Sequence, residues 1–193
     1  MIDMYYNYYS QHLPAAQHTC YAVIVFLPNH LDDIIAALRE KYDPIYNLVA
    51  SHITLMFPFE TDKPLDDLIG LIRTETARQP STLIELDSIG DFYPRSPVIY
   101  WGVKKNEDLN NLYYRLYSCL NLPLPYKQYL PHVTVAREIS DHRVMLVKDK
   151  IVSYLPSEKF VAEKVDLITP LSGNKWVSVR TFPLTGRRPS LPL

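Results

Sequence analysis

Two short stretches decide the fold, SHITLMFPF at 51–59 and PHVTVAR at 131–137. Each is an apolar run in which a histidine and a threonine stand two positions apart. Alternate residues of a strand point to the same face, so His52 and Thr54 share one face of the first strand, with aliphatic residues on the other. The second stretch repeats the arrangement. We therefore expect two strands that each bury one side and present an imidazole beside a hydroxyl on the other.

Similar series of elements surround the two stretches, as judged from apolar periodicity and turn residues. The second half of the chain runs helix, His-x-Thr strand, helix, strand, strand, and the first half repeats this series after an opening strand. We expect an α+β fold of two lobes about a pseudo-two-fold axis, with two antiparallel sheets flanked by helices around a central cleft. The expected strands are 19–28, 52–59, 82–93, 98–104, 132–137, 159–169 and 175–184, and the expected helices are 31–42, 64–79, 107–122 and 141–155.

The two ends of the chain differ in composition from its middle. Residues 1–17 are polar and rich in tyrosine, and the last residues are polar and proline-containing. We expect an N-terminal arm over 1–17, a single bilobal domain over 18–186 and a flexible tail over 187–193. The tyrosines of the arm either pack on the domain surface or stack on nucleic-acid bases.

Composition and charge restrict the class of protein and ligand. The chain has 193 residues, of which 47% are hydrophobic and 21% charged, as is usual for a globular protein. Its net charge of −1 provides no broad basic field for long nucleic acid, but it is compatible with a local site for a small anion or a nucleic-acid end. Neither a signal peptide nor an apolar run of about 18 residues is evident. The two cysteines suggest neither a disulfide framework nor a zinc site. We expect a cytoplasmic protein without a membrane segment.

The paired histidines suit phosphoryl chemistry. An unperturbed pKa of about 6.5 lets an imidazole act as base or as acid near neutral pH. Across one phosphate, His52 and His132 could divide the work, one deprotonating the nucleophile and the other protonating the leaving oxygen. Thr54 and Thr134 would hydrogen-bond the non-bridging oxygens. No metal or other cofactor is needed for this scheme. A lone strand histidine is more often structural, but two copies in matching positions favour function.

HITL at 52–55 and HVTV at 132–135 resemble the paired H-x-T/S-x motifs of the two-histidine (2H) phosphoesterase superfamily. YLPHVTVAR at 129–137 is similar to the 2′-5′ RNA ligase/cyclic phosphodiesterase branch, and the resemblance covers about residues 19–184. It implies a bilobal fold whose cleft is lined by the four motif residues. It also implies metal-independent and ATP-independent hydrolysis of 2′,3′-cyclic or 2′,5′-linked phosphodiesters, with reverse 2′-5′ RNA ligation as a further activity.

The resemblance also implies roles for the motif residues. His52 and His132 would be the catalytic acid/base pair, and Thr54 and Thr134 would bind the substrate phosphate. In the usual family assignment, His132 would activate water and His52 would protonate the leaving 3′-oxygen, giving a 2′-phosphate. The partner would be a nucleotide or RNA end, and a monomer is expected.

Three further residues are candidate substrate contacts. Tyr129 would stack on a base or simply pack. Tyr100 and Trp101 face opposite sides of their expected strand, so one of them should look into the cleft, and Trp101 is a candidate for base contact. Arg137 would pair with phosphate or with a surface carboxylate.

Two other functions fit the same sequence. The first is a non-catalytic RNA-end or nucleotide-binding module that has kept the cleft and uses the tyrosine arm for stacking. The second is a structural α+β domain whose histidines form hydrogen bonds in the core. The arrangement of the two imidazoles, facing each other across an open cleft or apart, separates these readings from catalysis.

Overall fold

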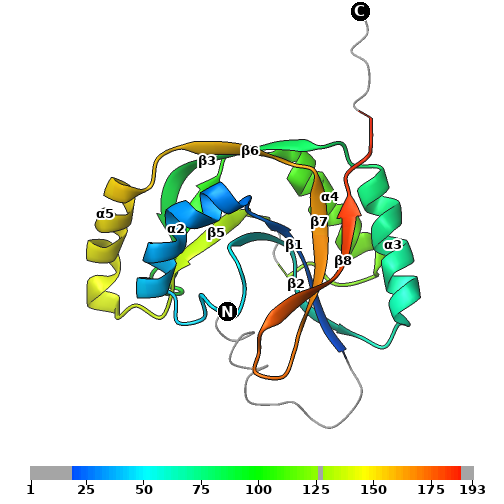
Figure 1. Cartoon of the computed structure of the whole chain (residues 1–193), viewed down its shortest axis with the longest axis horizontal. Helices are drawn as coiled ribbons and strands as arrows, with labels where there is room; N and C mark the ends of the chain where they lie inside the picture. Colours follow the sequence, from blue (N-terminus) through cyan, green and yellow to red (C-terminus); the bar gives the residue numbers. More distant parts are fainter. Residues whose placement is uncertain (1–18, 126–127, 188–193) are drawn as a thin grey trace, which may run out of the picture.

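The computed structural model describes residues 19–125 and 128–187, and the eight strands within them pair antiparallel as one curled sheet (Figure 1). The strand order is β6-β3-β4-β5-β2-β1-β7-β8. The strands are β1 Thr19–Phe26, β2 His52–Thr61, β3 Thr82–Asp91, β4 Ile99–Val103, β5 His132–Ala136, β6 Glu158–Ala162, β7 Lys164–Pro170 and β8 Trp176–Pro183. The helices are α2 Asn29–Tyr42, α3 Leu65–Ala77, α4 Glu107–Cys119 and α5 Val144–Tyr154, the last preceded by the 3₁₀ turn η1 Asp141–Arg143.

The α+β class is confirmed, while the two expected sheets are halves of a single one. One half is β6-β3-β4-β5 and the other is β2-β1-β7-β8. They join where β5 lies beside β2, through the pair Ile53 and Val133. Figure 1 shows α2 and α5 at one side of the molecule and α3 and α4 at the other. The two His-x-Thr strands are thus neighbours at the centre of the sheet.

The segment expected as one strand over 159–169 is two strands that belong to opposite halves. β6 pairs with β3, whereas β7 pairs with β1 and β8, and Glu163 separates them. The expectation was wrong because strand-forming residues continue through this segment while the hydrogen-bonding partner changes. The β7–β8 hairpin is confirmed, and Gly173 and Asn174 supply its positive φ angles of 85° and 62°.

Strand alternation places the core on one side of the central strands. Ile53 and Leu55 on β2, and Val133 and Val135 on β5, are fully buried at 0% exposure. Helix α4 packs against β2, and α2 packs against β5, so each half of the sheet is covered by a helix that follows a strand of the other half. This exchange ties the halves together.

Parts of the sequence-based domain prediction lie outside the described residues. The arm over 1–17 and most of the tail over 187–193 belong to this group. Within residues 19–125 and 128–187, no helix is both long and apolar enough to cross a membrane.

Candidate active site

The pair formed by Ile53 and Val133 organises the candidate site. In an antiparallel ladder, residues on either side of a matched pair also lie opposite one another. His52 therefore lies across from Thr134, on the face of the sheet opposite to the core. By the same rule, Thr54 on β2 lies across from His132 on β5.

The two histidines are diagonal neighbours in this arrangement. Cα atoms at such diagonal positions are typically about 7–8 Å apart. His52, Thr54, His132 and Thr134 are all half-buried, whereas the residues between them are buried. One face of β2 and β5 thus presents two imidazoles and two hydroxyls related by the local two-fold axis of the ladder.

Backbone carbonyls select the same tautomer for both histidines. Nδ1 of His52 lies 2.8 Å from the carbonyl oxygen of Ala50, and Nδ1 of His132 lies 2.8 Å from that of Leu130. A carbonyl can only accept, so each Nδ1 carries a proton and donates it. The neutral rings therefore hold their lone pairs on Nε2. Both rings leave Nε2 as the nitrogen that can take up or release a proton.

Burial keeps both imidazoles neutral near pH 7. The pKa of His52 is lowered to about 4, first by burial and then by the positive charges of Arg39 and Arg137, while the hydrogen bond to Ala50 opposes this change. Burial also lowers the pKa of His132, and Arg137 acts in the same direction. His132 itself disfavours protonation of His52. The two rings are therefore close enough that a proton on one discourages a proton on the other.

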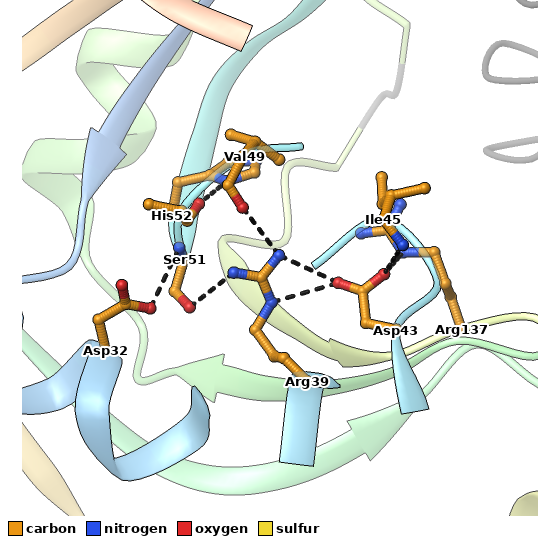
Figure 2. A network of polar contacts seen from close by, with 9 residues as sticks. Asp32, Arg39, Asp43, Ile45, Val49, Ser51, His52 and Arg137 are labelled. Atoms are coloured by element: carbon orange, nitrogen blue, oxygen red, sulfur yellow. Dashed lines mark hydrogen bonds and ion pairs between the residues drawn. The ribbon is translucent and has the colours of Figure 1, made fainter. Parts of the chain in front are cut away.

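Arg39 organises the backbone that leads into His52 (Figure 2). Its guanidinium donates to Ser51 Oγ at 2.9 Å and to the carbonyl oxygen of Val49 at 3.0 Å. The backbone N–H of Ser51 donates in turn to Asp32 Oδ1 at 3.3 Å. Arg39 is only 4% exposed although it is charged. These contacts hold residues 49–51, which include the carbonyl group that orients the first imidazole.

Asp43 joins two arginines behind the first histidine (Figure 2). Its Oδ2 accepts from Arg39 at 3.1 Å and 3.2 Å, and its Oδ1 lies 2.8 Å from Arg137 Nε. The Asp43 side chain is fully buried. Arg137 therefore pairs with a buried carboxylate, and the expected alternative of a surface carboxylate is wrong. The two arginines thus share one aspartate.

Aromatic rings flank the second histidine. The ring centroids of Phe92 and Tyr100 each lie 5.1 Å from that of His132. Tyr100 pairs with Thr134 across β4 and β5, which places it on the face of the motif residues. Trp101 pairs with Val133, points into the core and is 1% exposed, so the prediction that it contacts substrate is wrong. Strand alternation alone does not decide which of Tyr100 and Trp101 faces the motif residues.

Tyr129 is a packing residue. It is 6% exposed, and its ring stacks on Tyr113 with centroids 4.2 Å apart and planes 7° apart. Its hydroxyl donates to the carbonyl oxygen of Thr54 at 2.7 Å. The structure therefore favours the packing role of Tyr129 over base stacking. Its hydrogen bond also links it to strand β2.

Sequence reasoning missed Arg39 and Phe92. Arg39 continues the buried stripe of helix α2 formed by Leu31 and Ile35, so a charge at a core position was the available signal. Phe92 lies just after β3, and the pattern of the sequence does not indicate that it meets His132. Across the described part of the chain, no three His, Cys, Asp or Glu side chains gather closely enough to hold a metal ion.

The chain is similar in sequence to a known family and to several bacterial proteins. A family model for the 2′-5′ RNA ligase superfamily matches residues 27–174. A predicted phosphoesterase of Bacillus licheniformis is 31% identical over 166 residues, covering 84% of this chain and 96% of that protein. A predicted phosphoesterase of Geobacillus kaustophilus is 27% identical over 168 residues, covering 86% of this chain and 97% of that protein.

Two solved structures show the same fold. The Escherichia coli protein LigT, complexed with 3′-AMP, aligns with a TM-score of 0.65 at 19% identity, covering 88% of this chain and 99% of LigT. A Thermus thermophilus protein aligns with a TM-score of 0.65 at 18% identity, covering 88% of this chain and 100% of that one. At these identities the likeness concerns the fold alone.

Proposed function

The chain belongs to the 2′-5′ RNA ligase superfamily, whose members are 2H phosphoesterases, and on that premise we propose that it hydrolyses 2′,3′-cyclic or 2′,5′-linked phosphodiesters at nucleotide or RNA ends. One observation carries the proposal. His52 and His132 lie at diagonal positions around the strand pair Ile53–Val133. In each ring Nδ1 is hydrogen-bonded to a backbone carbonyl, which leaves Nε2 for proton transfer. Two such nitrogens on one face suit a reaction that needs a base and an acid.

Hydrolysis of a cyclic phosphate would need one proton removed and one supplied. The water oxygen forms a bond to phosphorus as one Nε2 takes its proton. The bond from phosphorus to the 3′-oxygen breaks as the other Nε2 donates a proton to that oxygen, and a 2′-phosphate results. At the end of the cycle, proton exchange with water restores both rings.

The charges around the two rings differ. The charge of Arg39 adds to that of Arg137 at His52, which makes its imidazolium the stronger acid. At His132, burial lowers the pKa and the charge of Arg137 acts in the same direction. A bound phosphodiester anion would favour protonation of one ring and so offset the effect of burial there. In line with the usual assignment in the superfamily, His132 would activate water, and His52 would protonate the leaving oxygen.

The threonines would hold the phosphate, and the charge of Arg137 would favour its binding. Thr54 and Thr134 flank the same pair as the histidines and can donate from their hydroxyls to the non-bridging oxygens. Arg137 lies close enough to both imidazoles to influence their protonation. Its positive charge favours an anion at that place. The reverse reaction, 2′-5′ ligation, would use the same groups in the opposite order.

The test is a hydrolysis screen on the purified protein. The substrates are 2′,3′-cyclic nucleotides, ADP-ribose cyclic phosphate and 2′,5′-linked oligonucleotides, each with and without EDTA. We expect turnover of at least one class, unaffected by EDTA and abolished in H52Q and H132Q. Binding without turnover across the whole panel would instead favour a non-catalytic nucleotide-binding module.

A further inference from the structure

The cluster of Phe92, Tyr100 and His132 builds an aromatic wall on one side of the candidate site. The rings of Phe92 and Tyr100 lie 4.6 Å apart between centroids, and each is in contact with the imidazole. Both aromatic residues are half-buried, so each keeps part of its surface in solvent. We refer to Phe92 and Tyr100 together as the aromatic wall.

Glycine makes room for the Tyr100 ring. Gly90 pairs with Tyr100 across β3 and β4, and a Cβ at Gly90 would overlap the tyrosine ring. The ring therefore lies directly over the glycine. A second glycine, Gly102, pairs with His132, and a Cβ there would meet the hydroxyl oxygen of Ser88 on β3 at 2.7 Å. The missing Cβ at Gly90 thus lets the phenol ring of Tyr100 pack beside His132.

The hairpin that carries the wall is anchored at both ends. The backbone N–H of Phe92 donates to the carbonyl oxygen of Val98 at 3.0 Å. The preceding residue, Asp91, forms an ion pair of 2.7 Å with Lys148 on α5, and both side chains are largely buried. Burial and the charge of Asp91 raise the pKa of Tyr100, so its ring stays neutral. The wall is a preorganised, uncharged surface.

The other histidine has different surroundings. Phe26 pairs with His52 across β1 and β2, but it packs against a small apolar cluster that includes Ile24 and Val49. Behind His52 lies Arg39 with its ion pair to Asp43. The two sides of the site are therefore unlike, with preorganised rings beside His132 and packed or charged groups beside His52.

We propose that the aromatic wall stacks on the nucleobase of the substrate, so that the protein selects base-bearing phosphodiesters and holds the base on the His132 side. This inference rests on the proposed function. Flat rings with solvent-facing area bind bases through stacking, which tolerates any base because every base has a π face. The wall therefore selects for a base without selecting its identity.

The experiment compares two substrates that share the reacting group. One is 2′,3′-cyclic AMP, and the other is methyl β-ribofuranoside 2′,3′-cyclic phosphate, which has no base. For Y100L and F92L, we expect KM for the nucleotide to rise roughly fivefold to a hundredfold, the range of base–aromatic stacking. KM for the base-free substrate should stay within about twofold. Y100F keeps the ring and should keep the wild-type KM.

A variant at Gly90 tests the position of the Tyr100 ring without replacing the tyrosine. G90A should displace the Tyr100 ring and raise KM for the nucleotide alone. G70A is the matched control, because a Cβ at Gly70 on α3 meets nothing within 4 Å. Y154L, at an exposed position of α5, controls for the loss of a tyrosine. Thermal melting verifies that each variant is folded.

Several outcomes would overturn the inference. If Y100L and F92L change both substrates equally or neither, the wall acts on His132 or on stability rather than on a base. If F26L, and not Y100L, raises KM selectively, the base lies on the opposite side. If the wild-type protein hydrolyses neither substrate nor any other of the panel, the proposed function itself fails, which is a distinct result.

Discussion

Ile53 on β2 and Val133 on β5 lie opposite one another at the junction of the two half-sheets, and both are fully buried. Each is the middle residue of a His-x-Thr motif. A local two-fold axis therefore passes between these two side chains, and the packing of one core pair determines the spacing of two histidines and two threonines.

Replacing either histidine should remove activity and preserve the fold. H52Q and H132Q should each lower kcat by roughly 10²- to 10⁴-fold, the usual contribution of a general acid or base. The midpoint of urea unfolding at pH 7 should change little, because both rings are neutral there. H142Q is the control, since His142 is exposed on the turn η1. A variant at either motif position that keeps more than about a tenth of the activity would contradict the acid/base assignment.

The threonine hydroxyls should matter through hydrogen bonding and not through shape. T54V and T134V keep the volume of the side chain and remove the donor. We expect kcat/KM to fall roughly tenfold to a hundredfold, as for the loss of a hydrogen bond to a charged group. T54S and T134S should recover most of the activity. If valine and serine variants behave alike, the hydroxyls do not bind the phosphate.

Arg39 should act as a positioning residue through the segment before His52. R39M removes the donors to Val49 and Ser51 and one charge that lowers the pKa of His52. We expect kcat to fall and the acid limb of the kcat–pH profile to move to higher pH. R39K keeps the positive charge without the forked geometry of the guanidinium. It should therefore lower kcat and leave the acid limb of the kcat–pH profile at its wild-type pH.

A merely structural role for Arg39 would give a different pattern. R39M would then lower the free energy of unfolding, on the order of 3–5 kcal/mol for a broken buried ion pair, while the pH profile of the folded fraction stayed as in the wild type. Urea unfolding of R39M and R39K, measured beside the kinetics, separates the two cases. Asp43 keeps Arg137 as a partner in both variants.

Tyr129 should affect stability without affecting substrate binding. Y129F keeps the stack on Tyr113 and removes the donor to the Thr54 carbonyl. We expect the free energy of unfolding to fall by about 1–3 kcal/mol, the cost of leaving a buried acceptor without its partner. KM for a cyclic nucleotide should not change. A raised KM at unchanged stability would return Tyr129 to the substrate site.

Acidification should weaken the fold through His52. Its pKa is about 4 in the folded chain and about 6.5 when unfolded. Between these pH values the unfolded chain binds more protons than the folded chain. The contribution of neutral His52 to stability is therefore fully present above pH 6.5 and is lost as the pH falls toward 4. Urea unfolding at pH 7 and at pH 4.5 should show this loss, and it should be smaller in H52Q. An identical loss in H52Q and H142Q would contradict the lowered pKa.

Local patterns in the sequence were sufficient for much of the fold and for the four motif residues. A period of two residues puts His and Thr on one face of a strand whatever surrounds it. Helix and strand positions agreed with the structure within a few residues, because apolar periodicity and turn residues act locally. The main exception was the break at Glu163, where the chain changes its partner strand.

Contacts between distant segments required the tertiary structure. Tyr100 and Trp101 have opposite orientations on β4, and only the pairing of β4 with β5 shows that Tyr100 stands beside Thr134 and that Trp101 packs in the core. Arg137 and Tyr129 likewise have partners, Asp43 and the carbonyl of Thr54, that lie far away in the chain.

The sequence by itself determined that two strands each carry an imidazole beside a hydroxyl, because side-chain alternation depends only on the backbone of one strand. The tertiary structure alone decided that these strands are neighbours joined at Ile53 and Val133. It also decided that one histidine lies beside buried arginines and the other beside aromatic rings. Burial and charge come from segments that meet only when the chain folds, and for that reason two motifs alike in sequence have unlike surroundings.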